Sequence, residues 1–395
     1  MTTRLERWRS PEGGSPLSPQ SRRAWRRELG HDVVAALPAW LTARALVLAA
    51  LAAAHPLHTN FRPIESSALR LRQGLLAWDG EWFYRIASEG YGALPRAGLR
   101  YFPLFPALGR GLATVLFANV GLSLIVLANA LALVAGAALY RLTLRESGDE
   151  RLARRATWML ALAPPSFVLV MGYTESLAIL LAVVTFSALR RQRWGWAALG
   201  GFLSGLARPL GVLLSIPAAI EALPRLRAGP FHQRLVGLAA VGAPVAGCLT
   251  YLAWVGLRFG DPLLPYSSQQ TPAFRGGFAN PLVTLAKTGG DLVAGRFATK
   301  NVPHLPWAVV LIVLVVVACR RWPPSYGAFA VATLMVALST ERLGSLERYG
   351  FACFPVVLAL ASVTDSERVR RVVLVLSGVA MTTYATLTFL ALYVP

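Results

Sequence analysis

The sequence predicts an all-α, polytopic membrane protein with about eleven membrane-spanning helices. Of its 395 residues, 55% are hydrophobic and only 15% are charged, against about 25% charged residues in an ordinary soluble domain. Long apolar runs such as residues 309–319 recur along the chain. A soluble protein of this length would bury its apolar residues in one or two cores. These runs are too long and too numerous for that, so we expect lipid to surround them.

The first apolar run covers about residues 33–54 and is expected to be an uncleaved span. It is longer than the ~7–15 residues of a signal sequence and contains Arg44. Residues 1–30, which precede it, are polar and arginine-rich, and we expect a disordered basic tail there. The other expected spans are at about 120–140, 156–171, 174–189, 195–207, 209–223, 235–257, 304–319, 325–340, 350–364 and 372–393.

Two of these segments, on either side of Arg208-Pro209, are each shorter than the about 20 residues that a full crossing needs. Proline prevents a regular helix from running through this point. The two segments are therefore either one broken helix or a tight helical pair.

The basic residues predict which loops face the cytoplasm. If the N-terminal tail is inside, five loops are inside as well, and together with the tail they hold 23 of the 39 Lys and Arg residues. Short loops rich in these residues stay on the cytoplasmic side. The five loops are residues 141–155, 190–194, 224–234, 320–324 and 365–371.

Residues 31–395 are accordingly expected to form one integral membrane domain of the cell membrane, with residues 55–119 and 259–303 as extracytoplasmic loops. The first loop contains an amphipathic stretch near 69–91 and a short, proline-interrupted apolar segment at 102–117, which predict interfacial helices. The net charge of +20 fits basic loops facing anionic lipid. No basic stripe alternates with aromatic residues, so a nucleic-acid partner is not expected.

On this topology, the polar residues outside the basic clusters lie mostly on the outer side. A charge costs about 2.5–3.5 kcal/mol at the bilayer centre, so each of these residues must face a partner, water or a ligand. The alternative for any one of them is ordinary helix capping or ion pairing. The segments are Trp78-Asp79-Gly80-Glu81-Trp82, Tyr173-Thr174-Glu175-Ser176, Arg208-Pro209, Gly260-Asp261-Pro262 and Ser345-Leu346-Glu347-Arg348-Tyr349.

Asp79 is the strongest single candidate for chemistry. Its neighbours Trp78 and Trp82 suit a membrane interface and also stack on sugar rings. A carboxylate in this position could accept a proton from a sugar hydroxyl. The alternative is a structural Asp-Gly turn held by interfacial tryptophans.

Arg208 and Arg348 suit a phosphate, because a guanidinium forms bidentate, charge-assisted hydrogen bonds to it. The alternative is that each pairs with Glu175 or Glu347. No protein metal site is expected, since the three cysteines lie singly in apolar runs and no phosphate-binding glycine loop or zinc-binding helix is present.

These segments together resemble the PIG-V family of mannosyltransferases, in the GT-C superfamily of polytopic glycosyltransferases, and the bacterial members most closely. They stand in the family's order. The matching stretches are AWDGEWFYRIASEGY (77–91), YFPLFPALGR (101–110), PPSFVLVMGYTESLAILL (164–181), GLARPLGVLL (205–214), GDPL from Gly260, and SLERYGFACFP (345–355).

The resemblance implies a GT-C-like fold, a polyprenyl-phosphate mannose donor, an inverting mechanism and an active site on the extracytoplasmic face. It places the essential acid at Asp79. The donor- and acceptor-binding residues that it implies are Trp78, Glu81, Trp82, Tyr173, Glu175, Arg208, Arg348 and Tyr349. Many members carry Asp-x-Asp where this chain has Asp79-x-Glu81, which leaves the role of the second acid open.

No cofactor is expected to be required, although a divalent cation could bind at Asp79 and Glu81. The expected partners are the lipid-linked donor, membrane lipids, and a glycolipid or glycan acceptor. Three alternatives stay open: transfer of another sugar, such as arabinose or glucose, a lipid or solute transporter, and a structural protein. A transporter would distribute its charges along a path through the bilayer.

Overall fold

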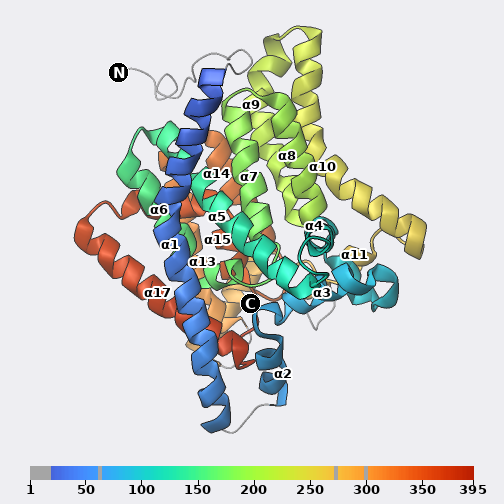
Figure 1. Cartoon of the computed structure of the whole chain (residues 1–395), viewed down its shortest axis with the longest axis vertical. Helices are drawn as coiled ribbons and strands as arrows, with labels where there is room; N and C mark the ends of the chain where they lie inside the picture. Colours follow the sequence, from blue (N-terminus) through green and yellow to red (C-terminus); the bar gives the residue numbers. More distant parts are fainter. Residues whose placement is uncertain (1–18, 61–64, 271–274, 298–300) are drawn as a thin grey trace.

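The computed structural model describes residues 19–60, 65–270, 275–297 and 301–395, and it is built of helices (Figure 1). Within these residues the only β-type pairing is an isolated bridge between Phe278 and Thr340. The all-α prediction is thus confirmed. The start of α1 lies at one end of the helical bundle and the C-terminus lies near its middle in this view.

The helices are, in chain order, α1 (Pro19–Asn60), α2 (Glu65–Gln73), α3 (Asp79–Glu89), α4 (Leu104–Ala113), α5 (Val120–Ser147), α6 (Glu150–Leu162), α7 (Glu175–Arg190), α8 (Trp194–Ala207), α9 (Ser215–Ala228), α10 (Phe231–Phe259), α11 (Leu264–Ser267), α12 (Pro281–Val293), α13 (Leu305–Arg321), α14 (Pro324–Leu338), α15 (Leu346–Ala352), α16 (Phe354–Val363) and α17 (Glu367–Phe389). Two 3₁₀ segments, η5 (Pro164–Leu169) and η6 (Pro209–Leu214), precede α7 and α9.

The N-terminal part of the chain differs from the prediction. Helix α1 begins at Pro19, so it extends into the segment that was expected to belong to the tail. Residues 1–18 of that tail lie outside the described residues.

Six of the described helices are long and apolar enough to cross a membrane, and a seventh crossing results if the bent pair α15–α16 counts as one span. This confirms a polytopic membrane protein, but it does not confirm eleven spans. Helices α6, α7, α8 and α14 have 13, 16, 14 and 15 residues, fewer than the about 20 that an untilted crossing needs. The six are residues 30–59, 120–147, 209–228, 231–259, 302–321 and 367–389.

The segments around Arg208 form a helical pair rather than one broken span. Helix α8 ends at Ala207, and Arg208 is extended, with φ −157° and ψ 151°. Proline at 209 disfavours a helical residue before it. The chain then returns antiparallel to α8. The contact between the two far ends shows this course: the Arg225 guanidinium, near the end of α9, donates to the Gln192 side chain just before α8.

The five loops predicted to be cytoplasmic come together at one end of the bundle. Ion pairs and hydrogen bonds connect them to each other and to the beginning of α1. These contacts join Arg141 to Asp32, Arg190 to Glu146 and Glu221, Arg225 to Gln192, Arg155 to Asp365, and Arg321 to the Ser362 carbonyl. The candidate site residues described below lie at the segments that connect the opposite ends of these helices.

Helices α8 and α10 pack through glycines that leave no room for a side chain. A Cβ atom on Gly205 would lie 2.0 Å from the Pro244 carbonyl oxygen, and one on Gly247 would lie 1.9 Å from the Phe202 carbonyl oxygen. Small residues at such crossings let two backbones approach closely in a membrane. This contact fixes α8, and with it the position of Arg208 at its end.

We therefore expect Gly247→Ala to lower the thermal unfolding temperature of the detergent-solubilised protein, because overpacking costs about 1–3 kcal/mol. Gly242→Ala in the same helix is the control. A Cβ there meets nothing within 4 Å, so the change should be neutral or slightly stabilising. Equal melting temperatures for the two variants would show that the α8–α10 contact is looser than described.

Candidate active site

Asp79 is the first residue of α3 and lies beside a strained turn. Trp78, just before it, has a positive φ of 62°, which is uncommon for a bulky residue. Two contacts hold this tryptophan in place: its indole N–H donates to the Thr388 carbonyl at 3.0 Å, and the Arg70 guanidinium lies 4.0 Å from the ring centre. The turn aims the Asp79 carboxylate into the site.

Three groups contact the carboxylate and backbone of Asp79. The Tyr101 hydroxyl donates to Oδ1 at 2.7 Å, and Arg348 Nη1 donates to Oδ2 at 2.8 Å. The backbone N–H of Asp79 donates to the Tyr173 hydroxyl at 3.2 Å, and that hydroxyl donates to the Ala77 carbonyl. The Asp79 side chain remains 25% exposed, so a substrate can reach it.

These contacts keep Asp79 ionised. Burial alone raises its pKa, but the charge of Arg348, the hydrogen bonds from Tyr101 and Arg348, and the charge of Arg100 outweigh burial and leave the pKa below its ordinary value. Burial and the neighbouring Asp79 raise the pKa of Tyr101 well above its ordinary value. Tyr101 therefore stays protonated and acts as a hydrogen-bond donor.

Glu175, the first residue of α7, is the second acid of the site and is almost fully buried. It accepts a hydrogen bond from Arg208 Nη1 at 3.0 Å, and Arg348 Nε lies 3.4 Å from the same oxygen. Arg348 thus bridges Asp79 and Glu175. The ion-pair alternative considered for the two arginines is present in the structure, with Glu175 as the shared partner.

Glu347 does not pair with either arginine. It contacts His304 Nδ1 at 3.0 Å and accepts a hydrogen bond from the Tyr393 hydroxyl. Glu347 and Arg348 are successive residues of α15, and successive side chains on a helix point in different directions. Glu347 therefore belongs to a separate buried cluster next to the site.

Tyr349 lies among three guanidinium groups. Its ring centre is 4.6 Å from Arg275, 5.3 Å from Arg208 and 5.5 Å from Arg348. Arg275 was not among the predicted site residues. Only its position in the second long loop, followed by two glycines, distinguishes it in the sequence.

An aromatic wall stands on the other side of Asp79. Trp82 stacks on Tyr101 with ring centres 5.7 Å apart and an interplanar angle of 18°. Arg100 Nη2 donates to the Tyr101 hydroxyl at 2.7 Å. Neither Tyr101 nor Arg100 was predicted as a site residue, although Tyr101 begins one of the stretches that carried the family resemblance.

The structure thus brings together most of the predicted site residues from distant parts of the chain. Glu81 is the exception: it lies on the Arg70 side of α3. Burial lowers the pKa of Arg70, and the charges of Tyr173 and Glu81 oppose that shift. The residues that meet around Asp79 are Trp78, Trp82, Tyr173, Glu175, Arg208, Arg348 and Tyr349.

Metal binding at Asp79 would need a rearrangement of these contacts. Both of its oxygens accept hydrogen bonds, and in the described part of the chain no three His, Cys, Asp or Glu side chains gather as potential ligands. The arginines supply the positive charge next to the carboxylate.

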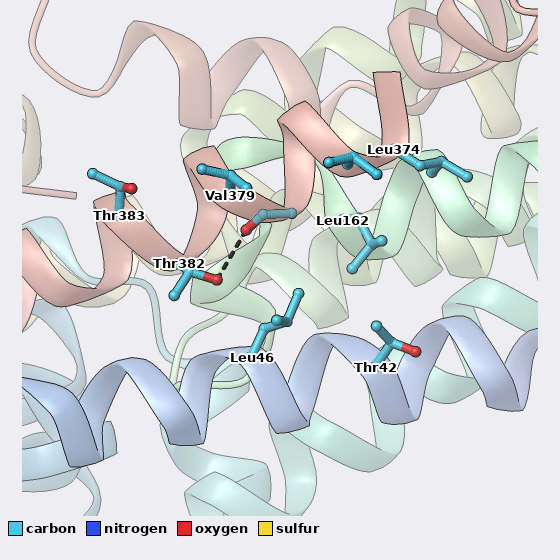
Figure 2. Close-up of a pocket in the computed structure, with 9 residues that line it drawn as sticks. Thr42, Leu46, Leu162, Leu374, Val379, Thr382 and Thr383 are labelled. Atoms are coloured by element: carbon cyan, nitrogen blue, oxygen red, sulfur yellow. Dashed lines mark hydrogen bonds between the residues drawn. The ribbon is translucent and has the colours of Figure 1, made fainter. Parts of the chain in front are cut away.

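A separate groove of about 490 Å³ opens between α1 and α17 (Figure 2). Leu46, Leu162, Leu374 and Val379 line it, and hydroxyls of Thr42 and Thr382 are its few polar groups. None of the candidate site residues contributes to it. Both helices are among the six that could cross a membrane, so the groove is part of the apolar surface of the bundle.

One part of the chain is similar to a known protein family. Residues 41–217 match the Mannosyltransferase (PIG-V) family. This segment includes Asp79, Tyr173, Glu175 and Arg208, and it ends before Arg275 and Arg348. No curated protein matches the chain.

Among solved structures, the chain is similar to the archaeal oligosaccharyltransferase AglB from Archaeoglobus fulgidus in complex with an inhibitory peptide and a dolichol-phosphate. The identity is 13% and the TM-score 0.44, over 91% of this chain and 56% of that chain. The apo form of the Archaeoglobus fulgidus oligosaccharyltransferase matches with 14% identity and a TM-score of 0.42, over 88% and 56% of the two chains. The chain therefore spans a little over half the length of these proteins, and TM-scores in this range do not establish a shared fold.

The described helices that could cross a membrane and the family match over residues 41–217 make this chain similar to membrane glycosyltransferases. Within that class, the similarity is to the PIG-V mannosyltransferases.

We expect Tyr101→Phe to change the pH dependence of glycosyl transfer. The Tyr101 hydrogen bond lowers the pKa of Asp79, so its loss raises that pKa, and the carboxylate becomes protonated at a higher pH. If transfer needs ionised Asp79, the acidic limb of the kcat/KM profile moves to higher pH. Tyr84→Phe, in α3, is the control and should leave the profile in place. An unshifted profile in Tyr101→Phe would contradict this role of the hydroxyl.

Proposed function

We propose that this protein transfers mannose from a polyprenyl-phosphate donor to an extracytoplasmic acceptor hydroxyl, with inversion and with Asp79 as the general base. The observation that carries this proposal is a partly exposed, ionised carboxylate held next to a guanidinium pair. Transfer of a sugar from a phosphate to a hydroxyl requires a base and a phosphate-binding group next to each other.

The aromatic wall supports a sugar at this position. Trp82 is half-buried and stacks on Tyr101, so a sugar ring next to Asp79 would meet aromatic side chains, which contribute both apolar area and a polar edge. The Tyr101 hydroxyl and the Arg100 guanidinium add hydrogen-bond donors along the same wall.

The reaction is a single displacement. The acceptor oxygen forms a bond to the anomeric carbon as the bond from that carbon to the phosphate oxygen breaks. The hydroxyl proton passes to Asp79, and the phosphate leaves with its bonding electrons as polyprenyl phosphate. Each Asp79 oxygen accepts one hydrogen bond from the protein and keeps a second lone pair for this proton.

The resting contacts couple donor binding to the activation of the base. Arg348 is shared between Asp79 and Glu175, so a donor phosphate near Arg348 competes with Asp79 for its N–H groups. Weakening that ion pair raises the pKa of Asp79, since the charge of Arg348 lowers it. Asp79 then becomes a stronger base only when the donor is bound.

The arginines also allow transfer without a divalent cation. Stabilising the departing phosphate needs positive charge, and Arg208 and Arg348 already lie within one ion-pair network. No cofactor is included in the proposed mechanism for this reason. The family match favours this enzyme class over a transporter.

We expect Asp79→Asn to lower the rate of mannosyl transfer by at least about 100-fold, because positioned general bases typically contribute 10²–10⁴-fold. The assay uses purified protein, labelled polyprenyl-phosphate mannose and an extracted membrane acceptor fraction, and it is run with EDTA and with Mg²⁺. Glu81→Gln is the matched control on α3 and should have a smaller effect.

Near-wild-type turnover by Asp79→Asn would exclude Asp79 as the base. Loss of activity in EDTA that Mg²⁺ restores would instead show that a metal shares the charge stabilisation. The melting temperature of each variant shows whether a lost activity reflects lost folding.

The proposed orientation places α3 outside the cell and the basic end of the bundle inside. Labelling with a membrane-impermeant maleimide tests it, in a background in which Cys248, Cys319 and Cys353 are replaced by alanine. We expect Ser88→Cys, exposed on α3, to react in intact cells, and Ser366→Cys, exposed before α17, to react only after permeabilisation. The opposite pattern would place the site in the cytoplasm.

A further inference from the structure

We propose that Arg275, together with Arg208 on the same Tyr349 ring, forms the anion site that binds the phosphate of the lipid donor. This inference rests on the proposed function and names the residue that anchors the donor head group. Three features of the structure carry it: the way the loop is held, the position of the guanidinium, and the charge balance of the site.

A short backbone pairing holds Arg275 over the site. The N–H of Arg342 donates to the Arg275 carbonyl at 3.1 Å, and the N–H of Glu341 donates to the Gly277 carbonyl at 3.2 Å. Gly276, which lies between Arg275 and Gly277 in the chain, has a φ of +71°, and a Cβ there would lie 2.4 Å from Glu341 Oε2. A glycine is therefore needed for the loop to approach this closely.

The Arg275 side chain points from this loop toward Tyr349. Its Nη2 donates to the Ala337 carbonyl at 2.8 Å, and its guanidinium carbon lies 4.6 Å from the Tyr349 ring centre. Its Nε is buried without a hydrogen-bond partner. The guanidinium is thus fixed at one end and retains an unused donor, and a buried donor of this kind favours an acceptor.

The charges around Tyr349 do not balance. Two carboxylates, Asp79 and Glu175, form the ion pairs of Arg348 and Arg208. Among the described residues Arg275 forms no ion pair, and its hydrogen bonds go to the neutral Ala337 carbonyl and Thr340 hydroxyl. Around Tyr349 the three arginines therefore exceed the two carboxylates by one positive charge, while Arg100 lies on the other side of Asp79, next to Tyr101.

A sugar linked to a lipid through one phosphate carries one negative charge, which matches this excess. A phosphate on Arg275 would lie next to Arg208 across the Tyr349 ring, where it can accept charge-assisted hydrogen bonds from both arginines. Arg348, on the same ring, would remain close enough to respond to the bound phosphate. Arg275 is then the residue that anchors the head group, and Arg348 is the residue that links it to Asp79.

Binding of polyprenyl phosphate to the full-length protein in detergent tests this, with the shift in melting temperature as the readout and polyprenyl alcohol as the uncharged reference. Arg275→Gln keeps an N–H donor for the Ala337 carbonyl but removes the charge. We expect it to bind polyprenyl phosphate about tenfold more weakly or worse, with alcohol binding unchanged. Arg275→Lys keeps the charge without the planar fork and should be intermediate. Arg296→Ala, an exposed arginine, should match the wild type.

Wild-type affinity for polyprenyl phosphate in either Arg275 variant would overturn the inference, and the lysine variant decides the question if the glutamine variant does not fold. A wild-type protein that does not respond to polyprenyl phosphate would instead contradict the proposed donor. Equal protection by inorganic phosphate at the same concentration would show a site for the free ion rather than for a lipid head group.

Discussion

The ion-pair network of Arg348 is the interaction on which the rest of the site depends. Its guanidinium contacts Asp79 at the start of α3 and Glu175 at the start of α7, and only 7% of its side chain is exposed. Charges in such surroundings are stable only when they are paired and hydrogen-bonded. The network therefore holds three segments, far apart in the sequence, in one place, and the charge of Arg348 lowers the pKa of Asp79.

The bundle beneath the site supports this network through close backbone contacts. Arg208 is positioned by the end of α8, and α8 is packed against α10 through Gly205 and Gly247. The extended conformation of Arg208 follows from Pro209, which also turns the chain back along α8. Backbone packing within the bundle thus determines where Arg208, one of the groups proposed to bind phosphate, is placed.

Much of this arrangement follows from the sequence, because it depends on local rules. Long apolar runs indicate helices in lipid, and the density of arginines at alternate loops indicates which helix ends lie together; the contacts of Arg190 with Glu146 and Glu221 agree with that grouping. The number of spans did not follow, because short helices such as α8 and α14 are apolar without having the length of a crossing.

The residues that the sequence did not indicate are those whose role depends on contacts between distant loops. Arg275 reaches Tyr349 only because residues near it pair with residues near 340, and no periodic pattern encodes that pairing. Tyr101 begins one of the stretches that resemble the family, but nothing in the sequence around Tyr101 and Arg100 indicates that they lie next to Asp79. Glu347 was considered as a partner of Arg348, and only the geometry of α15 shows that it faces His304 instead.

The charge balance of the site gives a reason why Arg208 and Arg348 pair with carboxylates while Arg275 does not. A site in which every arginine had its own carboxylate would bind an anionic donor only by breaking ion pairs, whereas one in which both acids lacked partners would hold them protonated or solvated. With two acids and three arginines around Tyr349, the singly charged phosphate of the proposed donor would complete the balance. In the proposed mechanism the same phosphate would weaken the ion pair between Arg348 and Asp79, so that Asp79 becomes a stronger base when the donor is bound.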